Sequence, residues 1–186
     1  MVIPLIVRVP PKFQPAGWIP GSADEALVSH IDITATSLAL CGIERPASYD
    51  AQVFIGPESA PPRTVQFCAR DRADETVDRI RAARTAEWKY IRNYYPERPY
   101  TQPNHYKDTS YPSLQVMRQL KDEGKLTAAQ MPFMADTRPP EELYDLQTDP
   151  YELSNLAADA SQAAKLEEMR GQLDAWIAAT NDTGAV

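Results

Sequence analysis

The sequence predicts a mixed α/β fold, and three features of its hydrophobic pattern indicate this. Residues 4–9 form a short, nearly continuous apolar run, typical of a strand covered on both faces of a parallel or mixed sheet. Residues 64–70 alternate apolar and polar side chains with the period of a half-buried strand. An apolar stripe at helical spacing runs through residues 161–180. With 43% hydrophobic residues in a chain of 186, a sizeable core is expected and a wholly disordered chain is excluded.

The first third of the chain is predicted to contain one helix between loops. Ser29 can accept a hydrogen bond from the backbone N–H three residues on, and Asp32 lies in the first turn, where the helix dipole favours a negative charge. Gly42 supplies the stop after about three turns. The side chains that recur at helical spacing between these signals are Ile31, Ala35 and Leu38. The prolines and glycines of residues 10–28 and 43–63 predict loops, and the second loop is a plausible boundary between subdomains.

The rest of the chain is predicted to form a small antiparallel sheet and two further helices. A strand over residues 64–70 comes first, and the helix over 161–180 is expected to cover one face of the sheet. Between them we expect a hairpin over 79–84 and 87–95, an ordered loop over 96–112, a helix through Leu114 and Met117 that ends at Gly124, a loop over 131–140 and a strand over 142–146.

Composition excludes several classes of partner. Nineteen Lys and Arg against 26 Asp and Glu give a net charge of −7, which disfavours nucleic acid and an anionic membrane surface. No apolar run approaches the roughly 18–20 residues that a membrane span needs, so we expect a soluble chain. Residues 1–9 contain an apolar stretch but lack a basic leader and are a poor secretory signal, which leaves the localisation open. The two cysteines, Cys41 and Cys68, are too few for a disulfide scaffold, and both are expected to be small packed hydrophobes.

Most catalytic and metal-binding motifs are absent from the sequence. It has only two histidines, His30 and His105, and no Gly-x-Ser-x-Gly frames a serine. His30 lies beside the helix start and is interpreted as local structure, whereas His105 lies in a loop from which it could reach a site. There is no His-Glu-x-x-His, Cys-x-x-Cys, glycine-rich phosphate loop or glycine-centred calcium loop. No catalytic residue and no metal ligand is therefore predicted.

One charged cluster follows the predicted strand over residues 64–70. It consists of Arg70, Asp71, Arg72, Asp74 and Glu75, with Asp78 and Arg79 close behind. In one interpretation it is a solvated turn of ion pairs, each worth at most about 1 kcal/mol. In the other it binds substrate, because guanidinium groups grip a sulfate or carboxylate with two parallel hydrogen bonds while Asp accepts from sugar hydroxyls. The tyrosines of residues 90–111 either stack on sugar rings or belong to the core.

Taken in order, five segments resemble the C-terminal part of the sulfatase family, and most closely its bacterial members similar to heparan N-sulfatase and arylsulfatase. Together they extend over nearly the whole chain. The segments are Pro4-Leu5-Ile6-Val7-Arg8-Val9-Pro10; Val28-Ser29-His30-Ile31-Asp32 with Gly42-Ile43; Ala69-Arg70-Asp71-Arg72-Ala73-Asp74-Glu75; Lys89-Tyr90-Ile91-Arg92-Asn93; and Glu142-Leu143-Tyr144-Asp145-Leu146 with Asp149-Pro150-Tyr151-Glu152 and Asn155-Leu156.

The resemblance implies the C-terminal edge of an alkaline-phosphatase-like mixed sheet, followed by a small antiparallel sheet packed on a long C-terminal helix. In these terms residues 1–62 are a remnant of the catalytic α/β domain, and residues 63–186 are the C-terminal subdomain. The antiparallel sheet and long helix read from the residues themselves agree with this second part. The strand over residues 4–9 would belong to a large sheet whose other strands must come from elsewhere.

The family hydrolyses sulfate esters or sulfamates with a formylglycine made in a Cys/Ser-x-Pro-x-Arg motif, helped by a divalent cation, usually calcium. Cys68 and Arg72 have the spacing of that motif, but Arg70 stands where the motif has proline. After Cys41, Ile43 stands at the proline position. In the family both groups lie upstream of the strand that matches residues 4–9. The resemblance therefore implies a chain without the formylglycine or the calcium of an intact enzyme.

Two functions remain open at this point. In the first, the chain is the C-terminal part of a sulfatase, inactive alone, that shapes the pocket for a sulfated saccharide or aryl sulfate beside an upstream sulfatase domain. In the second it is a non-catalytic module that binds sulfated saccharide or assembles with another subunit, and exposed apolar edges would favour self-association. A metal hydrolase of another family is a distant third, since the acidic cluster has neither histidine nor a glycine turn.

Overall fold

The computed structural model describes residues 3–15, 17–73 and 75–184, and the chain divides into two compact units, residues 1–64 and 65–186. Unit 1 contains the short 3-10 helix η1 (Pro11–Phe13) and helix α1 (His30–Leu40). The predicted helix is confirmed together with its signals. The Ser29 N–H donates to the Asp32 carboxylate over 2.7 Å, and Gly42 follows the helix with a φ of 68°.

The strand predicted over residues 4–9 is wrong. These residues have no regular secondary structure, and the side chain of Ile6 is 92% exposed. A strand requires a neighbour that satisfies its backbone N–H and C=O groups. Every strand pair in the described part of the chain lies in unit 2, and none of these strands pairs with residues 4–9.

Helix α1 buries polar side chains and exposes apolar ones, which differs from the predicted stripe. Of the predicted stripe only Ala35 is buried, and Ile31 is exposed. The buried polar side chains hold the following loop: Asp32 accepts from the Gln52 N–H over 2.8 Å and pairs with Arg63. Burial raises the pKa of Asp32, but the hydrogen bonds from Arg63 and from backbone N–H groups lower it by more. The pKa of Asp32 is therefore lowered overall.

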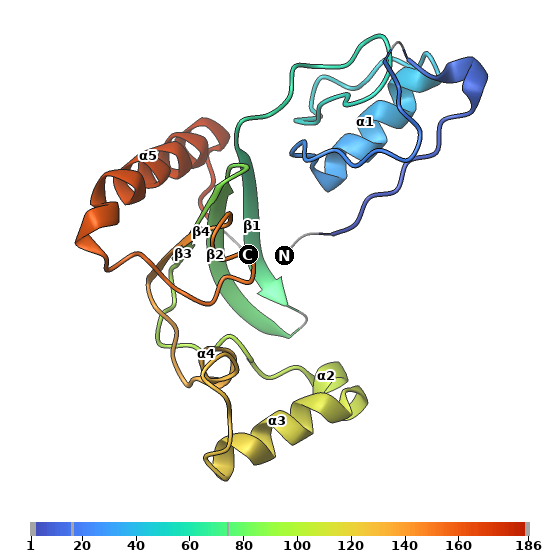
Figure 1. Cartoon of the computed structure of the whole chain (residues 1–186). Helices are drawn as coiled ribbons and strands as arrows, with labels where there is room; N and C mark the ends of the chain where they lie inside the picture. Colours follow the sequence, from blue (N-terminus) through green and yellow to red (C-terminus); the bar gives the residue numbers. More distant parts are fainter. Residues whose placement is uncertain (1–2, 16, 74, 185–186) are drawn as a thin grey trace. The chain divides into compact units, whose positions relative to one another are not determined.

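Unit 2 is built on a four-stranded antiparallel sheet in the order β1-β2-β3-β4 (Figure 1). The strands are β1 (Gln66–Ala73), β2 (Thr76–Arg84), β3 (Trp88–Asn93) and β4 (Glu141–Asp145). The predicted strands and hairpin are thus confirmed, with boundaries shifted by a few residues. Consecutive strands pair. Strand β4 joins the sheet after residues 94–140, a segment that we call the excursion.

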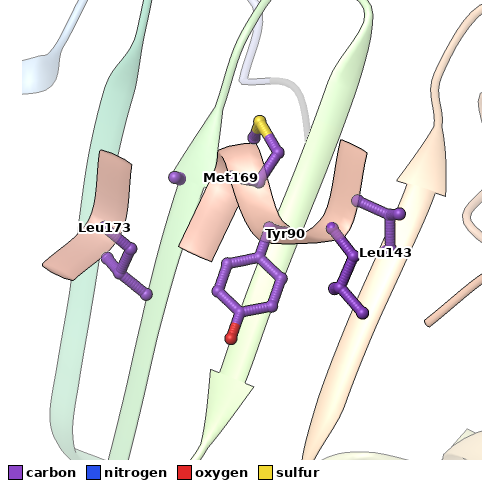
Figure 2. Close-up of a cluster of buried hydrophobic side chains, with 6 residues drawn as sticks. Tyr90, Leu143, Met169 and Leu173 are labelled. Atoms are coloured by element: carbon purple, nitrogen blue, oxygen red, sulfur yellow. The ribbon is translucent and has the colours of Figure 1, made fainter. Parts of the chain in front are cut away.

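Helix α5 (Ala163–Thr180) covers one face of this sheet, as predicted, after a short 3-10 turn η2 (Ala160–Gln162). Figure 2 shows Tyr90 and Leu143 from neighbouring strands beside Met169 and Leu173 of the helix. These four side chains are fully buried, and burying each apolar side chain stabilises the unit by about 1.5–3 kcal/mol. Phe67 of β1 and Trp176 of α5 stack with ring centroids 5.2 Å apart and extend the same core.

The excursion between β3 and β4 carries three helices, which lie beyond one end of the sheet (Figure 1). The predicted helix is confirmed as α3 (Pro112–Asp122). The loops expected before and after it also contain the short helices α2 (His105–Ser110) and α4 (Met131–Met134). Asn104 starts α2 by accepting from the Lys107 N–H over 2.8 Å, and Pro132 suits the first turn of α4, where no N–H donor is needed.

The expectation that both cysteines are packed is wrong, since Cys41 and Cys68 are exposed. Cys41 directly follows α1, at a helix end open to solvent. Cys68 follows Phe67 on the edge strand β1, and successive side chains of a strand point to opposite faces. Because Phe67 packs against α5, Cys68 faces the other way. In the described ranges no helix has both the length and the apolar character needed to cross a bilayer.

Candidate functional site

The charged turn, residues 70–75, lies where β1 and β2 meet, and a bulge interrupts their pairing there. Arg70 pairs with Ile80 and Arg72 pairs with Val77, so Asp78 and Arg79 together lie opposite the single residue Asp71. Such a bulge bends the strand and re-aims side chains. The Asp78 carboxylate supports it locally by accepting from the Arg79 N–H over 2.8 Å.

Asp78 is fully buried at this bulge and gathers polar side chains from distant parts of the excursion. Both of its oxygens accept from Arg138, one of them over 2.8 Å, and Gln102 donates to it over 2.7 Å. Burial raises the pKa of Asp78, yet the hydrogen bonds from Arg138 and the Arg79 N–H and the charges of Arg138 and Arg70 outweigh it, so the pKa is lowered. The carboxylate is therefore ionised at neutral pH and holds the excursion against the sheet.

Arg70 is the partly open cation of this group, which we call the Asp78 cluster: Asp78, Arg138, Gln102 and Arg70. Its Nη2 lies 3.9 Å from the Asp78 carboxylate, and its side chain is 38% exposed. Its Nε is buried and has no hydrogen-bond partner within the described part of the chain. A guanidinium that lies near a carboxylate on its buried side and is partly exposed on the other suits an anion that approaches from solvent.

Asp71 points to a different group of side chains. It pairs with the buried Arg81 over 2.8 Å, and Arg81 also donates to Asp182, which follows α5, over 2.8 Å. The pKa of Arg81 is raised by the hydrogen bond to Asp182, against the effect of burial. Asp71 thus links the bulge, through Arg81, to Asp182 near the C-terminus. Asp71 does not belong to the group of side chains around the Asp78 carboxylate that includes Arg70.

The far end of the charged turn is joined to the segment that leads into α2. Glu75 accepts from the backbone N–H of His105 over 2.7 Å, and Thr76 donates to the Pro103 carbonyl over 2.6 Å. Arg72 and His105 have exposed side chains beside these contacts. Asp74, the remaining predicted site residue, lies outside the described residues.

Most tyrosines of the region are structural. Tyr90 lies in the core, where burial raises its pKa to about 12. Tyr144 donates to Glu142 over 2.6 Å. The pKa of both Tyr144 and Tyr100 is raised, mainly by burial and in addition by the hydrogen bond to Glu142. Tyr144, Tyr100 and Glu142 thus satisfy one another's hydrogen bonds on the sheet face opposite α5. The exposed tyrosines of the excursion are Tyr106 and Tyr111.

Two side chains of the Asp78 cluster, Gln102 and Arg138, were not predicted from the sequence as site residues. Neither belongs to a motif, and they are separated from Asp78 by 24 and 60 positions. The proximity of Pro139 and Pro140 to Arg138 indicates only a loop. Residues that meet across such separations leave no local signal in a single sequence.

The described residues do not fit the calcium that the family resemblance implies for an intact enzyme. Within the described ranges, no three His, Cys, Asp or Glu side chains are grouped so that they could hold a metal ion. A hollow of about 280 Å³ beside α3, which includes Arg118 and Lys121 in its lining, also contains none of the predicted site residues.

The antiparallel sheet covered by a long C-terminal helix is a fold shared with solved sulfatases. A sulfatase structure from Bacteroides thetaiotaomicron and the structure of a 2-O GAG sulfatase each match with a TM-score of 0.51 and 21% identity, over 81% of this chain and 25% of theirs. A protein solved in complex with its substrate D-glucosamine-2-N,6-O-disulfate matches with a TM-score of 0.50 and 19% identity, over 82% of this chain and 24% of its own. At these identities the likeness shows the fold, which confirms the predicted class.

The sequence comparison adds a relative. The chain is 39% identical over 180 residues to an ulvan-active sulfatase from Formosa agariphila, which covers 96% of this chain and 29% of that protein. A scan against protein-family models finds no match. The predicted likeness to the sulfatase family is thus confirmed, and the chain spans less than a third of the curated relative, which fits a C-terminal portion. A closer relation to heparan N-sulfatases stays a prediction.

Proposed function

We propose that this chain is the C-terminal part of a sulfuric ester or sulfamate hydrolase, and that its charged turn binds the sulfate group of a saccharide substrate. The observation that carries the proposal is the match to the ulvan-active sulfatase over 96% of the chain, which includes the whole charged turn. A related fold solved with a disulfated glucosamine as its substrate supports a sulfated saccharide as the ligand.

The arrangement of the charges suits this role. A chain with a net charge of −7 needs a local concentration of cations to bind a polyanion. Arg70 and Arg72 provide it at one end of the sheet, and Asp78 lies 3.9 Å from Arg70 on the buried side. Glu75 and Asp74 complete the proposed site as acceptors for sugar hydroxyls, while Asp71 contributes through the bulge that it ties to Arg81.

We further propose that the formylglycine and the calcium site belong to a sulfatase domain outside these 186 residues. The departures from Cys/Ser-x-Pro-x-Arg at Arg70 and Ile43 support this. Unit 1 supports a partner domain, because α1 exposes large apolar side chains and the exposed segment over residues 3–7 has no strand partner within the described residues. A second copy of the chain is the alternative occupant of this surface.

Replacing Arg70 by alanine is expected to weaken binding of D-glucosamine-2-N,6-O-disulfate about 10- to 100-fold, because hydrogen bonds to a charged group contribute about 1.5–3 kcal/mol. Isothermal titration calorimetry of the full chain at low ionic strength measures this. Arg8→Ala removes the same charge from an exposed position in unit 1 and should bind as the wild type does. Equal binding of unsulfated glucosamine, or an unchanged affinity in Arg70→Ala, would contradict the proposed site.

A chromogenic aryl sulfate assay tests where catalysis occurs. The chain alone is expected to show no turnover above the rate in buffer, with or without added calcium. A sulfatase domain supplied as a separate polypeptide, or a longer chain that contains Cys/Ser-x-Pro-x-Arg, should restore it. Hydrolysis by the 186-residue chain would show that its own residues suffice and would overturn this part of the proposal.

A further inference from the structure

Two tyrosines of the excursion are exposed although they contact each other. The side chains of Tyr106 and Tyr111 are 63% and 46% exposed, and their rings meet edge to face with centroids 5.6 Å apart. Other tyrosines nearby are engaged: Arg79 lies over the Tyr94 ring, and Arg98 lies over the Tyr95 ring. The core of unit 2 therefore does not use the Tyr106–Tyr111 pair, and its ring surfaces are open to a ligand.

The segment that carries the pair is fixed at both ends. At its start, the His105 N–H donates to Glu75 and the Pro103 carbonyl accepts from Thr76, so α2 begins against the charged turn. At its end, Arg118 of α3 pairs with Asp108, and Gln115 donates to the Asp108 carbonyl over 2.7 Å. An aromatic surface held in this way loses little conformational entropy when it binds a ligand.

We infer that the Tyr106–Tyr111 pair is a stacking surface for a second pyranose ring of the same saccharide whose sulfate binds at the charged turn. This inference rests on the proposed function and extends it from the sulfate group to a neighbouring sugar unit. The ligand class is a sulfated oligosaccharide of at least two rings. A monosaccharide sulfate or a free sulfate ion would use the charged turn alone.

The chemistry of the pair favours a sugar. The flat faces of tyrosine rings match the C–H face of a pyranose, and the phenolic hydroxyls can hydrogen-bond the hydroxyls at its rim. The exposed Lys107 lies between the two tyrosines in sequence and adds a cation on the same helix. Continuity with the charged turn through Glu75 and Thr76 argues for one ligand across both parts.

Tyr106→Ala and Tyr111→Ala are each expected to weaken binding of a heparin-derived tetrasaccharide about two- to tenfold, while binding of inorganic sulfate stays unchanged. Tyr106→Phe retains the ring and should retain at least half of the affinity. Tyr151→Ala is the matched control, because Tyr151 is 82% exposed and lies in another part of unit 2. Calorimetry measures the affinities, and circular dichroism checks that each variant is folded.

The outcomes separate this inference from the proposed function. If the wild-type chain binds neither the tetrasaccharide nor sulfate, or if Arg70→Ala has no effect, the proposed function fails. If Arg70→Ala weakens both ligands while Tyr106→Ala and Tyr111→Ala bind like the wild type, the charged turn stands and the stacking surface is wrong. An equal loss in Tyr151→Ala would also count against the surface, since it would indicate unspecific contacts.

Discussion

Replacing Arg138 by methionine lowers the free energy of unfolding of the chain by about 3–5 kcal/mol, because it removes the only cation that hydrogen-bonds the buried Asp78 carboxylate within the described residues. Arg138 and Asp78 are both fully buried and joined by two hydrogen bonds. Gln102 and the Arg79 N–H remain as uncharged donors, and Arg70 remains as a partly exposed cation 3.9 Å away. Urea unfolding followed by tryptophan fluorescence measures the change.

Two variants show whether charge burial is the cause. In Arg138→Met with Asp78→Asn the unpaired charge is removed, so this double variant should be at least as stable as Arg138→Met alone. Lys121→Met breaks the exposed pair with Asp136 and should cost less than about 1 kcal/mol. A loss of under 1 kcal/mol in Arg138→Met would mean that the pair does not hold the excursion to the sheet.

Acid is expected to destabilise the chain as the pH falls below about 4. The pKa of Asp78 lies below its ordinary 3.8 because Arg138 outweighs the effect of burial, and the hydrogen bond from Arg170 lowers the pKa of Glu141 from 4.5. A carboxyl with a lowered pKa in the folded state contributes stability above its unfolded pKa. That contribution is lost as the pH falls through the folded value. Urea midpoints at pH 7, 5, 4 and 3 test this.

Glu141→Gln isolates one part of the acid response. It removes the titrating group that pairs with Arg170, so the urea midpoint should fall less steeply between pH 5 and 3 than in the wild type. Glu167→Gln removes a more exposed carboxylate that pairs with the same arginine and should keep the wild-type dependence. A midpoint that does not change between pH 7 and pH 3 would contradict the paired carboxylates.

The Asp78 cluster has a consequence for the proposed function. The same carboxylate fixes the excursion through Arg138 and lies beside Arg70, so stability and the position of the proposed anion-binding guanidinium are coupled. Variants at Asp78 will therefore change both. Arg70, Tyr106 and Tyr111 are better probes of binding, because they lie at the accessible edge of this arrangement.

The local signals in the sequence predicted much of unit 2. Alternation over residues 64–70 and the apolar stripe that includes Leu166, Met169 and Leu173 describe a strand and a helix, each with one buried face, and both are present. The same reasoning failed for residues 4–9. An apolar run shows that a segment is suited to a sheet, but the strand forms only where other strands pair with it.

The sequence by itself determined the elements whose hydrogen bonds close locally or whose apolar pattern requires one particular face, and it carried the likeness to the sulfatases. Only the tertiary structure decided which side chains meet at the bulge opposite Asp71. Asp78, Gln102 and Arg138 converge because β2 bends there and because the excursion returns to the sheet before β4. Contacts of this kind depend on how distant segments pack, and a pattern confined to neighbouring residues does not contain that information.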